Sequence, residues 1–296
     1  MTLRLLSYNI KFGGRRRERA IAEVIRGATP DVVLLQEATD PRVIEQLALD
    51  TGLSHWGSRP DFSMGFLSRS RVEHHAWHQP GTARHHFLEL VVHGVECRIF
   101  GLHLVAWFSK WSERKRHREL RALLDGIREH QDGFHLIAGD FNALAPGELL
   151  EVTKMPAWIR GMIWLSGRDI ARDTIQLMLD EGYTDAWRQL HPEGPGYTFP
   201  TWDPHVRLDY VFLPKRYADR VAVCEIVFTP AEHVKEASDH HPLIVEVRWV
   251  RFPVESSSGA RSWQPAWRPA RDGKIPASFC CASPSVSCSS CMASPS

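Results

Sequence analysis

The sequence predicts an α/β domain, and two observations carry this prediction. Strand-like runs rich in Val, Leu and Ile alternate with helix-like segments from residue 3 to about residue 250. The 296-residue chain is 43% hydrophobic and 24% charged, so it can bury a substantial core. We expect a folded domain over residues 1–251. Residues 252–296 are dominated by Ser, Pro, Arg and Cys, and we expect this tail to be disordered.

The first segments set the alternation. Residues 3–10 (LRLLSYNI) form a short strand-like run, and apolar residues at helical spacing follow from Ala20 to Ala28. Pro30 then ends the expected helix. Residues 31–37 (DVVLLQE) are typical of a buried strand that ends in charge, and residues 41–50 are helix-like.

The middle of the chain continues in the same way. Residues 64–69, 85–94 and 95–104 predict three strands, the last two joined by a tight His-Gly turn. Ser112 is expected to cap a helix whose buried face is formed by Leu and Ile side chains. Residues 134–142 (FHLIAGDFN) predict another buried strand with a polar end.

Four more strand-like runs close the domain, at residues 198–202, 206–213, 221–228 and 241–249. The segment 146–182 interrupts the alternation and is rich in Met, Trp and Ile. It is either an inserted helical segment that packs on the core or a surface that faces a substrate or a lipid.

Overall charge and cysteine content exclude few classes of function. The net charge is +1, and the basic runs at Arg15–Arg17 and Lys110–Arg121 are typical of solvated faces. No run reaches the roughly 18 apolar residues of a membrane helix, and the first residues do not resemble a signal peptide, so a cytoplasmic location is expected. Cys97 and Cys224 are expected to be buried thiols. The tail cysteines could bind zinc or lie in a disordered segment (Cys280, Cys281, Cys288 and Cys291).

Polar side chains recur where the predicted strands end. They are Asn9, Glu37, His103, Asp140 with Asn142, and Asp209, and a further cluster opens the last strand, Ser238-Asp239-His240-His241. A buried carboxylate is costly unless it is paired or bound to metal. Six such positions in one domain therefore suggest that they converge on one rim of the sheets.

The residue types indicate the chemistry. Carboxylates such as Glu37 and Asp239 suit Mg²⁺, and Mn²⁺ as an alternative. The sequence has no HExxH motif, no G-x-S-x-G elbow and no P-loop, which disfavours a zinc protease, the commonest serine hydrolases and nucleoside triphosphatases. A metal with carboxylates, Asn and His favours attack by water on a phosphate.

Six motifs occur in order: SYNIKFGG, VVLLQEA, GLHL, AGDFNA, RLDYVFL and SDHHPL. Together they resemble the endonuclease/exonuclease/phosphatase family over residues 3 to about 249. The resemblance implies a four-layer α/β (α+β) sandwich in which two packed mixed sheets are flanked by helices. It also implies a divalent-metal-dependent hydrolase of phosphoesters.

The resemblance further implies a role for each motif residue. Glu37 matches the principal metal carboxylate, Asn9 helps to hold the metal or its water, and Asp239 is a further metal or water ligand. Asp140 and Asn142 match the pair that orients the attacking water. Asp209 and His240 match an Asp–His couple, and His103 matches a phosphate-contacting position.

The family acts on DNA, RNA, inositol phosphates and phospholipid headgroups, so the resemblance does not choose the substrate. Trp107, within an aromatic and basic stretch, and Trp202 with Arg207, close to Asp209, are candidate substrate contacts. We favour a nuclease or phosphodiesterase acting on nucleic acid. The alternatives are a phosphatase or phospholipid phosphodiesterase for a small or membrane-borne substrate, and a binding protein with an inactive site. A monomer is expected.

Overall fold

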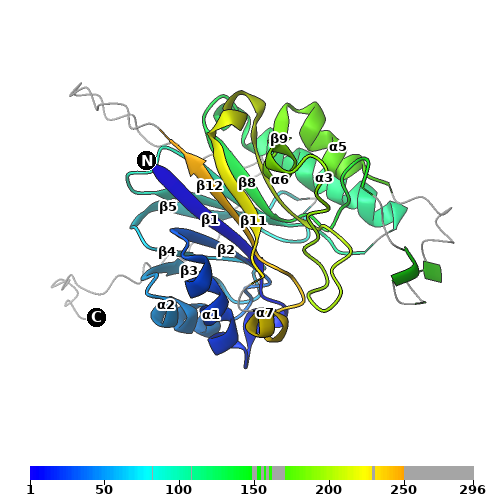
Figure 1. Ribbon diagram of the computed structural model, residues 1–296. Coiled ribbons are helices and arrows are strands. Elements are labelled where there is room, and N and C mark those ends of the chain that lie inside the picture. Colours follow the sequence, from blue (N-terminus) through cyan, green and yellow to red (C-terminus); the bar gives the residue numbers. More distant parts are fainter. Residues whose placement is uncertain are drawn as a thin grey trace, which may run out of the picture.

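The computed structural model describes residues 1–81, 83–107, 109–148, 152–154, 157, 160–161, 171–228 and 231–249. These residues form two packed six-stranded sheets with helices on both outer faces (Figure 1). The predictions for residues 252–296, including the four tail cysteines, lie outside the described residues. So does most of the Met- and Trp-rich part of segment 146–182.

The first sheet contains both ends of the domain. Its strand order is β11-β12-β1-β2-β4-β3, in which β1 and β2 are parallel and the other pairs antiparallel. β1 therefore lies between β2 and the last strand of the domain, β12. The strands are β1 (Thr2–Asn9), β2 (Val32–Gln36), β3 (His55–Gly57), β4 (Met64–Ser68), β11 (Val221–Ile226) and β12 (Leu243–Arg248).

The second sheet has the order β5-β6-β7-β8-β10-β9, with β7 and β8 parallel and the other pairs antiparallel. Its strands are β5 (Val72–His78), β6 (Phe87–Val92), β7 (Arg98–His103), β8 (His135–Asp140), β9 (Tyr183–Asp185) and β10 (Asp209–Pro214). Each sheet thus has a parallel pair near its centre. The carboxyl ends of such a pair meet at one edge of the sheet.

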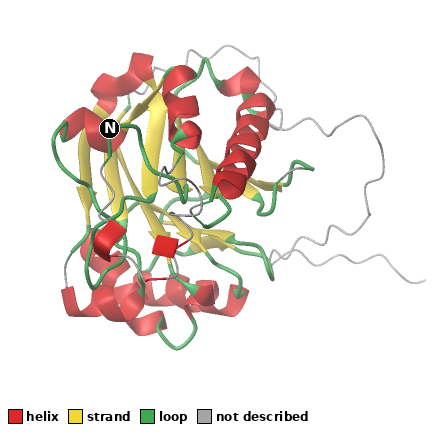
Figure 2. Ribbon diagram, turned by 90° about the vertical axis from the view of Figure 1, so that its right-hand side faces the viewer, coloured by secondary structure: helices red, strands yellow, loops and turns green. Residues whose placement is uncertain are grey.

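Helices cover the two outer faces, as Figure 2 shows from the side. Apolar side chains of the first sheet pack against α1 (Glu18–Ala28), α2 (Pro41–Thr51) and α7 (Ala231–Ala237). Those of the second sheet pack against α3 (Lys110–Gly126) and α5 (Asp173–Asp180). A third cluster fills the space between the sheets. The remaining helices are α6 (Ala186–Leu190), η1 (Phe12–Gly14), η2 (Arg128–His130), η3 (Val152–Lys154) and η4 (Lys215–Arg220).

The predicted four-layer sandwich is confirmed, and two local predictions need correction. Residues 198–202 form no strand but a loop with a single bridge between Phe199 and Val206. The helix α3 begins at Lys110 rather than after Ser112, because Ser109 is the cap and its hydroxyl accepts the Ser112 N–H at 3.1 Å. The thiols of Cys97 and Cys224 are buried and free, as expected.

None of the helices in the described part of the chain has the length and apolar character needed to cross a membrane.

Candidate active site

The polar ends of the central strands meet where the two sheets open at one rim. Asn9 is the last residue of β1, and Glu37 directly follows its parallel neighbour β2. In the second sheet His103 ends β7 and Asp140 ends β8, and the two are paired in register. Asp140 is also paired with Asp209, the first residue of β10. The topology thus gathers residues that are far apart in the sequence.

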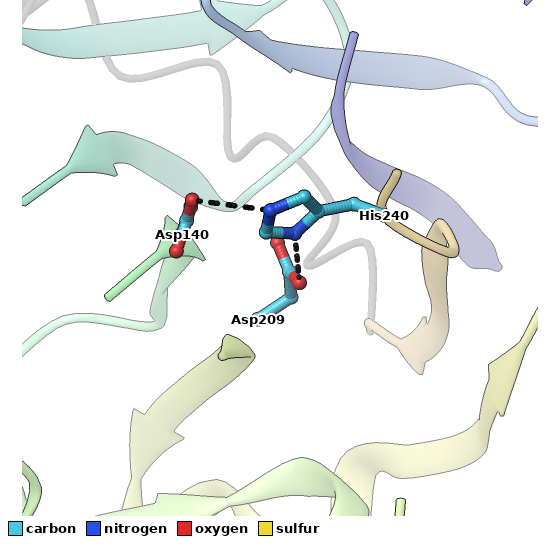
Figure 3. Close-up of side chains that lie close together, drawn as sticks. All are labelled: Asp140, Asp209 and His240. Carbon is cyan, nitrogen blue, oxygen red and sulfur yellow. Dashed lines mark hydrogen bonds and ion pairs between the residues drawn. The ribbon is translucent and has the colours of Figure 1, made fainter. Parts of the chain in front are cut away.

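Asp140, Asp209 and His240 form the buried centre of this rim (Figure 3). His240 Nδ1 is 2.8 Å from Asp209 Oδ2, and His240 Nε2 is 3.8 Å from Asp140 Oδ2. The imidazole therefore lies between two carboxylates, hydrogen-bonded to one and facing the other.

The charges of the two carboxylates determine the protonation state of His240. Burial disfavours the imidazolium, but the negative charges of Asp209 and Asp140 outweigh burial and raise the pKa of His240 to about 10. His240 is accordingly a positively charged hydrogen-bond donor at neutral pH.

Asp140 is the hub of the hydrogen bonds. Its Oδ1 accepts the backbone N–H of Asn142 at 2.9 Å, and its Oδ2 accepts the side-chain amide of Asn9 at 3.0 Å. Burial raises its pKa to about 7, and the charge of Asp209 adds to this against the opposing charge of His240. Asn142 has a left-handed backbone (φ +50°), and its own amide donates to the carbonyl of Leu104 at 3.1 Å.

Glu37 lies on the other side of Asn9. The Asn9 amide donates to Glu37 Oε1 at 3.2 Å, and the backbone N–H of Phe12 donates to Glu37 Oε2 at 2.6 Å. Glu37 itself has a left-handed backbone (φ +57°). Non-glycine residues in this region are uncommon and gather at functional sites.

His103 also faces Asp140, with its Nε2 3.7 Å from Asp140 Oδ2. Its Nδ1 is 2.5 Å from the hydroxyl of Ser63, which also accepts the backbone N–H of Glu37 at 3.2 Å. Burial and the positive charges of its neighbours hold the pKa of His103 well below its usual range. A neutral ring that accepts the Ser63 proton at Nδ1 carries its own proton on Nε2, facing Asp140.

Ser63 and His85 were missed by sequence reasoning. Ser63 lies in a loop before β4, and a lone serine there carries no recognisable signal. The ring of His85 stacks on that of His103 at a centroid distance of 4.8 Å. The adjacent His85-His86 pair gave no indication of this contact.

Asp239 lies at the outer edge of the site, where Lys11 Nζ is 3.0 Å from its Oδ2. The indole of Trp202 is close by, with Lys11 Nζ 6.0 Å from the ring centroid. Trp202 is 63% exposed, so its ring is accessible beside the site.

The prediction that Arg207 contacts the substrate is wrong, because its side chain is buried away from solvent. Its side chain is 1% exposed and forms ion pairs of 2.6 Å with Glu148 and with Asp185. The guanidinium also stacks over Tyr210 at 4.3 Å, so it braces the core. Trp107 follows β7 and is 53% exposed, and its carbonyl accepts a hydrogen bond from the buried Arg116.

The donor set fits a divalent cation. Glu37 and Asp239 offer carboxylate oxygens of the kind that Mg²⁺ and Mn²⁺ prefer, and the Asn9 amide donates to Glu37 Oε1 and so positions it. Asp209 Oδ1 is buried and has no hydrogen-bond partner among the described residues, which also suits a nearby cation or donor. Ligand atoms of Asp140, Asp209 and His240 lie within 4.8 Å of one another and form a second candidate cluster.

A two-sheet sandwich with carboxylates, amides and histidines at one rim defines the class of metal-dependent phosphoesterases. The chain belongs to the endonuclease/exonuclease/phosphatase family, whose model matches residues 6–240. It is therefore a hydrolase of phosphoesters, as the sequence predicted. No curated protein sequence matches the chain.

Several solved structures share the fold. A 3′ phosphatase from Neisseria, NExo, bound to a product DNA hairpin, is 20% identical with a TM-score of 0.64, covering 83% of this chain and 100% of that one. An endonuclease/exonuclease/phosphatase from Beutenbergia cavernae is 20% identical (TM-score 0.62; 83% and 71% covered). An AP endonuclease from Archaeoglobus fulgidus is 18% identical (TM-score 0.60; 82% and 98% covered).

Proposed function

We propose that this protein is a Mg²⁺-dependent nuclease or phosphodiesterase that hydrolyses nucleic acid by attack of water on the phosphorus. One observation carries the proposal. The Nε2 atoms of His103 and His240 and the amide nitrogen of Asn9 all lie within 3.8 Å of Asp140 Oδ2. The carboxylate of Asp140 can orient the attacking water, and the hydrogen-bond donors around it can bind the oxygens of the phosphate under attack.

Each residue then has a defined task. Asp140 orients the attacking water and accepts its proton, with Asn142 fixing the carboxylate through its backbone N–H. His240, held by Asp209, donates to a phosphoryl oxygen and opposes the charge that develops there. His103 donates from Nε2 to the same phosphate, because Ser63 holds its Nδ1.

We assign the cation to Glu37, with Asp239 as a further oxygen ligand. Asn9 supports this site by donating its amide N–H to Glu37 Oε1. A bound Mg²⁺ would polarise the phosphoryl oxygen and offset its negative charge. The alternative cluster of Asp140, Asp209 and His240 is less suitable, because Asp209 Oδ2 already engages His240 Nδ1 at 2.8 Å and Asp140 is needed as the base.

Nucleic acid is favoured as the substrate for two reasons. Two exposed tryptophans each lie next to a partly exposed lysine: Trp202 with Lys11 beside Asp239, and Trp111 with Lys115 on α3. Side chains of these kinds bind the bases and phosphates of single strands. In addition, the Neisseria enzyme is bound to a DNA product and the Archaeoglobus enzyme is an AP endonuclease. We further propose that the enzyme is a cytoplasmic monomer.

The test is a panel of substrates with purified protein in Mg²⁺ or EDTA. The panel holds single-stranded DNA and RNA, an abasic duplex, inositol phosphates and sphingomyelin. We expect hydrolysis of a nucleic acid that EDTA abolishes. Exclusive cleavage of inositol phosphates or sphingomyelin would replace the nuclease proposal by the small-substrate or lipid alternative, and a silent protein would indicate an inactive site.

Matched variants locate the cation. Glu37→Gln should raise the Mg²⁺ concentration needed for half-maximal rate by at least about tenfold. Glu73→Gln, on the surface of β5, should change nothing. If Asp209→Asn raised the Mg²⁺ requirement instead, with Glu37→Gln close to wild type, the cation would belong to the Asp140–Asp209–His240 cluster.

A further inference from the structure

A small cleft opens beside Asp239, at the outer edge of the proposed active site. Its volume is about 190 Å³, and Lys11, Phe12 and Trp202 are among the residues that line it. We call the two aromatic residues, each with its own backbone segment, the Phe12 wall and the Trp202 wall. Phe12 and Trp202 are 77% and 63% exposed, which is unusual for side chains of this size. Sites for whole drug-sized ligands measure about 300–1,000 Å³, so this cleft suits one ring system of a larger substrate. We refer to it as the Phe12–Trp202 cleft.

The Phe12 wall is fixed to the proposed metal carboxylate. The backbone N–H of Phe12 donates to Glu37 Oε2, and the backbone N–H of Lys11 donates to Asn9 Oδ1 at 2.9 Å. Lys11 and Phe12 both have left-handed backbones, with φ +51° and +46°. Two consecutive strained residues persist only where the surroundings enforce them, and here Arg17 also holds the carbonyl of Lys11.

The Trp202 wall is fixed to the segment that carries Asp239 and His240. Thr201, the preceding residue, donates its backbone N–H to the carbonyl of Asp239 at 2.9 Å. The ring of Phe199 lies 6.3 Å from that of Trp202 and 5.0 Å from that of His240. Both walls are therefore held in a defined position relative to the phosphate that His240 would contact.

The charges around the cleft restrict what it can bind. Lys11 Nζ lies 5.8 Å from the Phe12 ring and 6.0 Å from the Trp202 ring, and Lys235 lines the same cleft. Two aromatic walls alone would also suit a quaternary ammonium headgroup. Arg17 also lines the cleft, as do the carboxylates of Glu236 and Asp239, and Asp239 is paired with Lys11 at 3.0 Å. Three cations against two carboxylates leave an excess of positive charge, which opposes a quaternary ammonium and favours an uncharged ring system attached to a phosphate.

Resting on the proposed nuclease function, we propose that the Phe12–Trp202 cleft is a stacking subsite for the nucleobase next to the scissile phosphate. Lys11 contacts the phosphodiester backbone at its entrance. Every base has a π face, so such a subsite tolerates any sequence. A base can enter it only after leaving its own stack, so the preferred substrate is single-stranded or has an unpaired end.

The test compares two substrates that differ only in their bases. One is a short single-stranded thymidine tract, and the other has the same length and phosphates but an abasic tetrahydrofuran unit at every position. We measure kcat/KM for both in Mg²⁺. Wild type should prefer the thymidine tract by at least about fivefold, because this is the lower end of what stacking on an aromatic side chain contributes per base.

The variants are Phe12→Ala and Trp202→Ala, with Phe12→Trp as the conservative replacement. Each alanine variant should lose about 5–100-fold on the thymidine tract and less than about twofold on the abasic tract. Phe12→Trp should keep the preference. The control is Leu49→Ala, which removes a side chain of similar exposure (73%) from α2 and should leave both rates unchanged.

Equal losses on both substrates would overturn the stacking subsite while leaving the nuclease function intact, since they would indicate a merely structural role for the two rings. An unchanged preference in both alanine variants would overturn it as well. Failure of wild type to cleave either tract, together with hydrolysis of inositol phosphates or sphingomyelin, would overturn the nuclease function itself.

Discussion

Replacing Asp209 with asparagine removes the charge opposite His240 but keeps an oxygen that can accept the Nδ1–H hydrogen bond. The two carboxylates raise the pKa of His240 from its ordinary 6.5 to about 10, although the ring is buried. This difference corresponds to roughly 5 kcal/mol of preference for the imidazolium, most of it due to Asp209. Without that charge, only Asp140 remains to counteract the lowering of the His240 pKa by burial, so this pKa should fall toward neutrality.

The expected consequence is a large loss of activity. If the charged imidazole donates to the phosphate, the Asp209→Asn variant should lose about 10²–10⁴ in kcat, the usual range for such a contribution. Asparagine has the same shape as aspartate and can still accept the hydrogen bond from His240, so the variant should fold. Because the lost interaction acts on the transition state, the loss should appear in kcat more than in KM.

Two measurements check this reasoning. A ¹H–¹⁵N imidazole titration in EDTA reports the pKa of His240, and initial rates in saturating Mg²⁺ report kcat. Asp132→Asn is the control, because that carboxylate is 96% exposed and pairs only with Arg216 among the described residues. An imidazole still fully protonated at pH 8 in Asp209→Asn, or a kcat within about threefold of wild type, would refute the assigned role of Asp209.

Three further predictions concern stability and metal. Burial lowers the pKa of His135 to about 4, so from pH 6.5 down to 4 only the unfolded chain takes up this proton. The fold should lose up to roughly 3 kcal/mol across that interval, and His135→Gln should flatten the acid limb of urea unfolding. Gly139→Ala should cost about 3 kcal/mol in urea unfolding, because the new Cβ would lie 1.9 Å from the Leu102 carbonyl oxygen, whereas Gly81→Ala meets no atom within 4 Å and should be near neutral. Saturating Mg²⁺ should raise the thermal midpoint of wild type, and Glu37→Gln should abolish this shift at the same concentration.

The strands and their polar ends could be predicted because both leave local signals. A run such as residues 134–142 is apolar enough to be buried, and its polar end includes Asp140, which needs a partner. The order of the six motifs then identified the fold. Residues 198–202 were misassigned because β-propensity does not report whether a neighbouring strand is available, and here a Pro and a turn leave a single bridge.

The residues that were missed act through contacts that are distant in sequence. Ser63 joins Glu37 to His103 across 26 and 40 residues, and nothing near Ser63 marks it. Arg207 was expected to contact the substrate because it lies close to Asp209 in the sequence. In the structure its guanidinium forms ion pairs with Glu148 and Asp185 instead. A sequence gives the charge of a side chain without giving the partners that neutralise it.

Asn9 illustrates why the site needs an amide where the two sheets meet. Its amide nitrogen donates to Glu37 Oε1 and to Asp140 Oδ2, joining the proposed cation ligand to the proposed base. Its oxygen accepts the backbone N–H of Lys11, which positions one wall of the Phe12–Trp202 cleft. An aspartate of the same shape could accept from Lys11 but would place a third negative charge between two carboxylates. Only a group that donates twice and accepts once holds the cation ligand, the base and the cleft in one rigid arrangement.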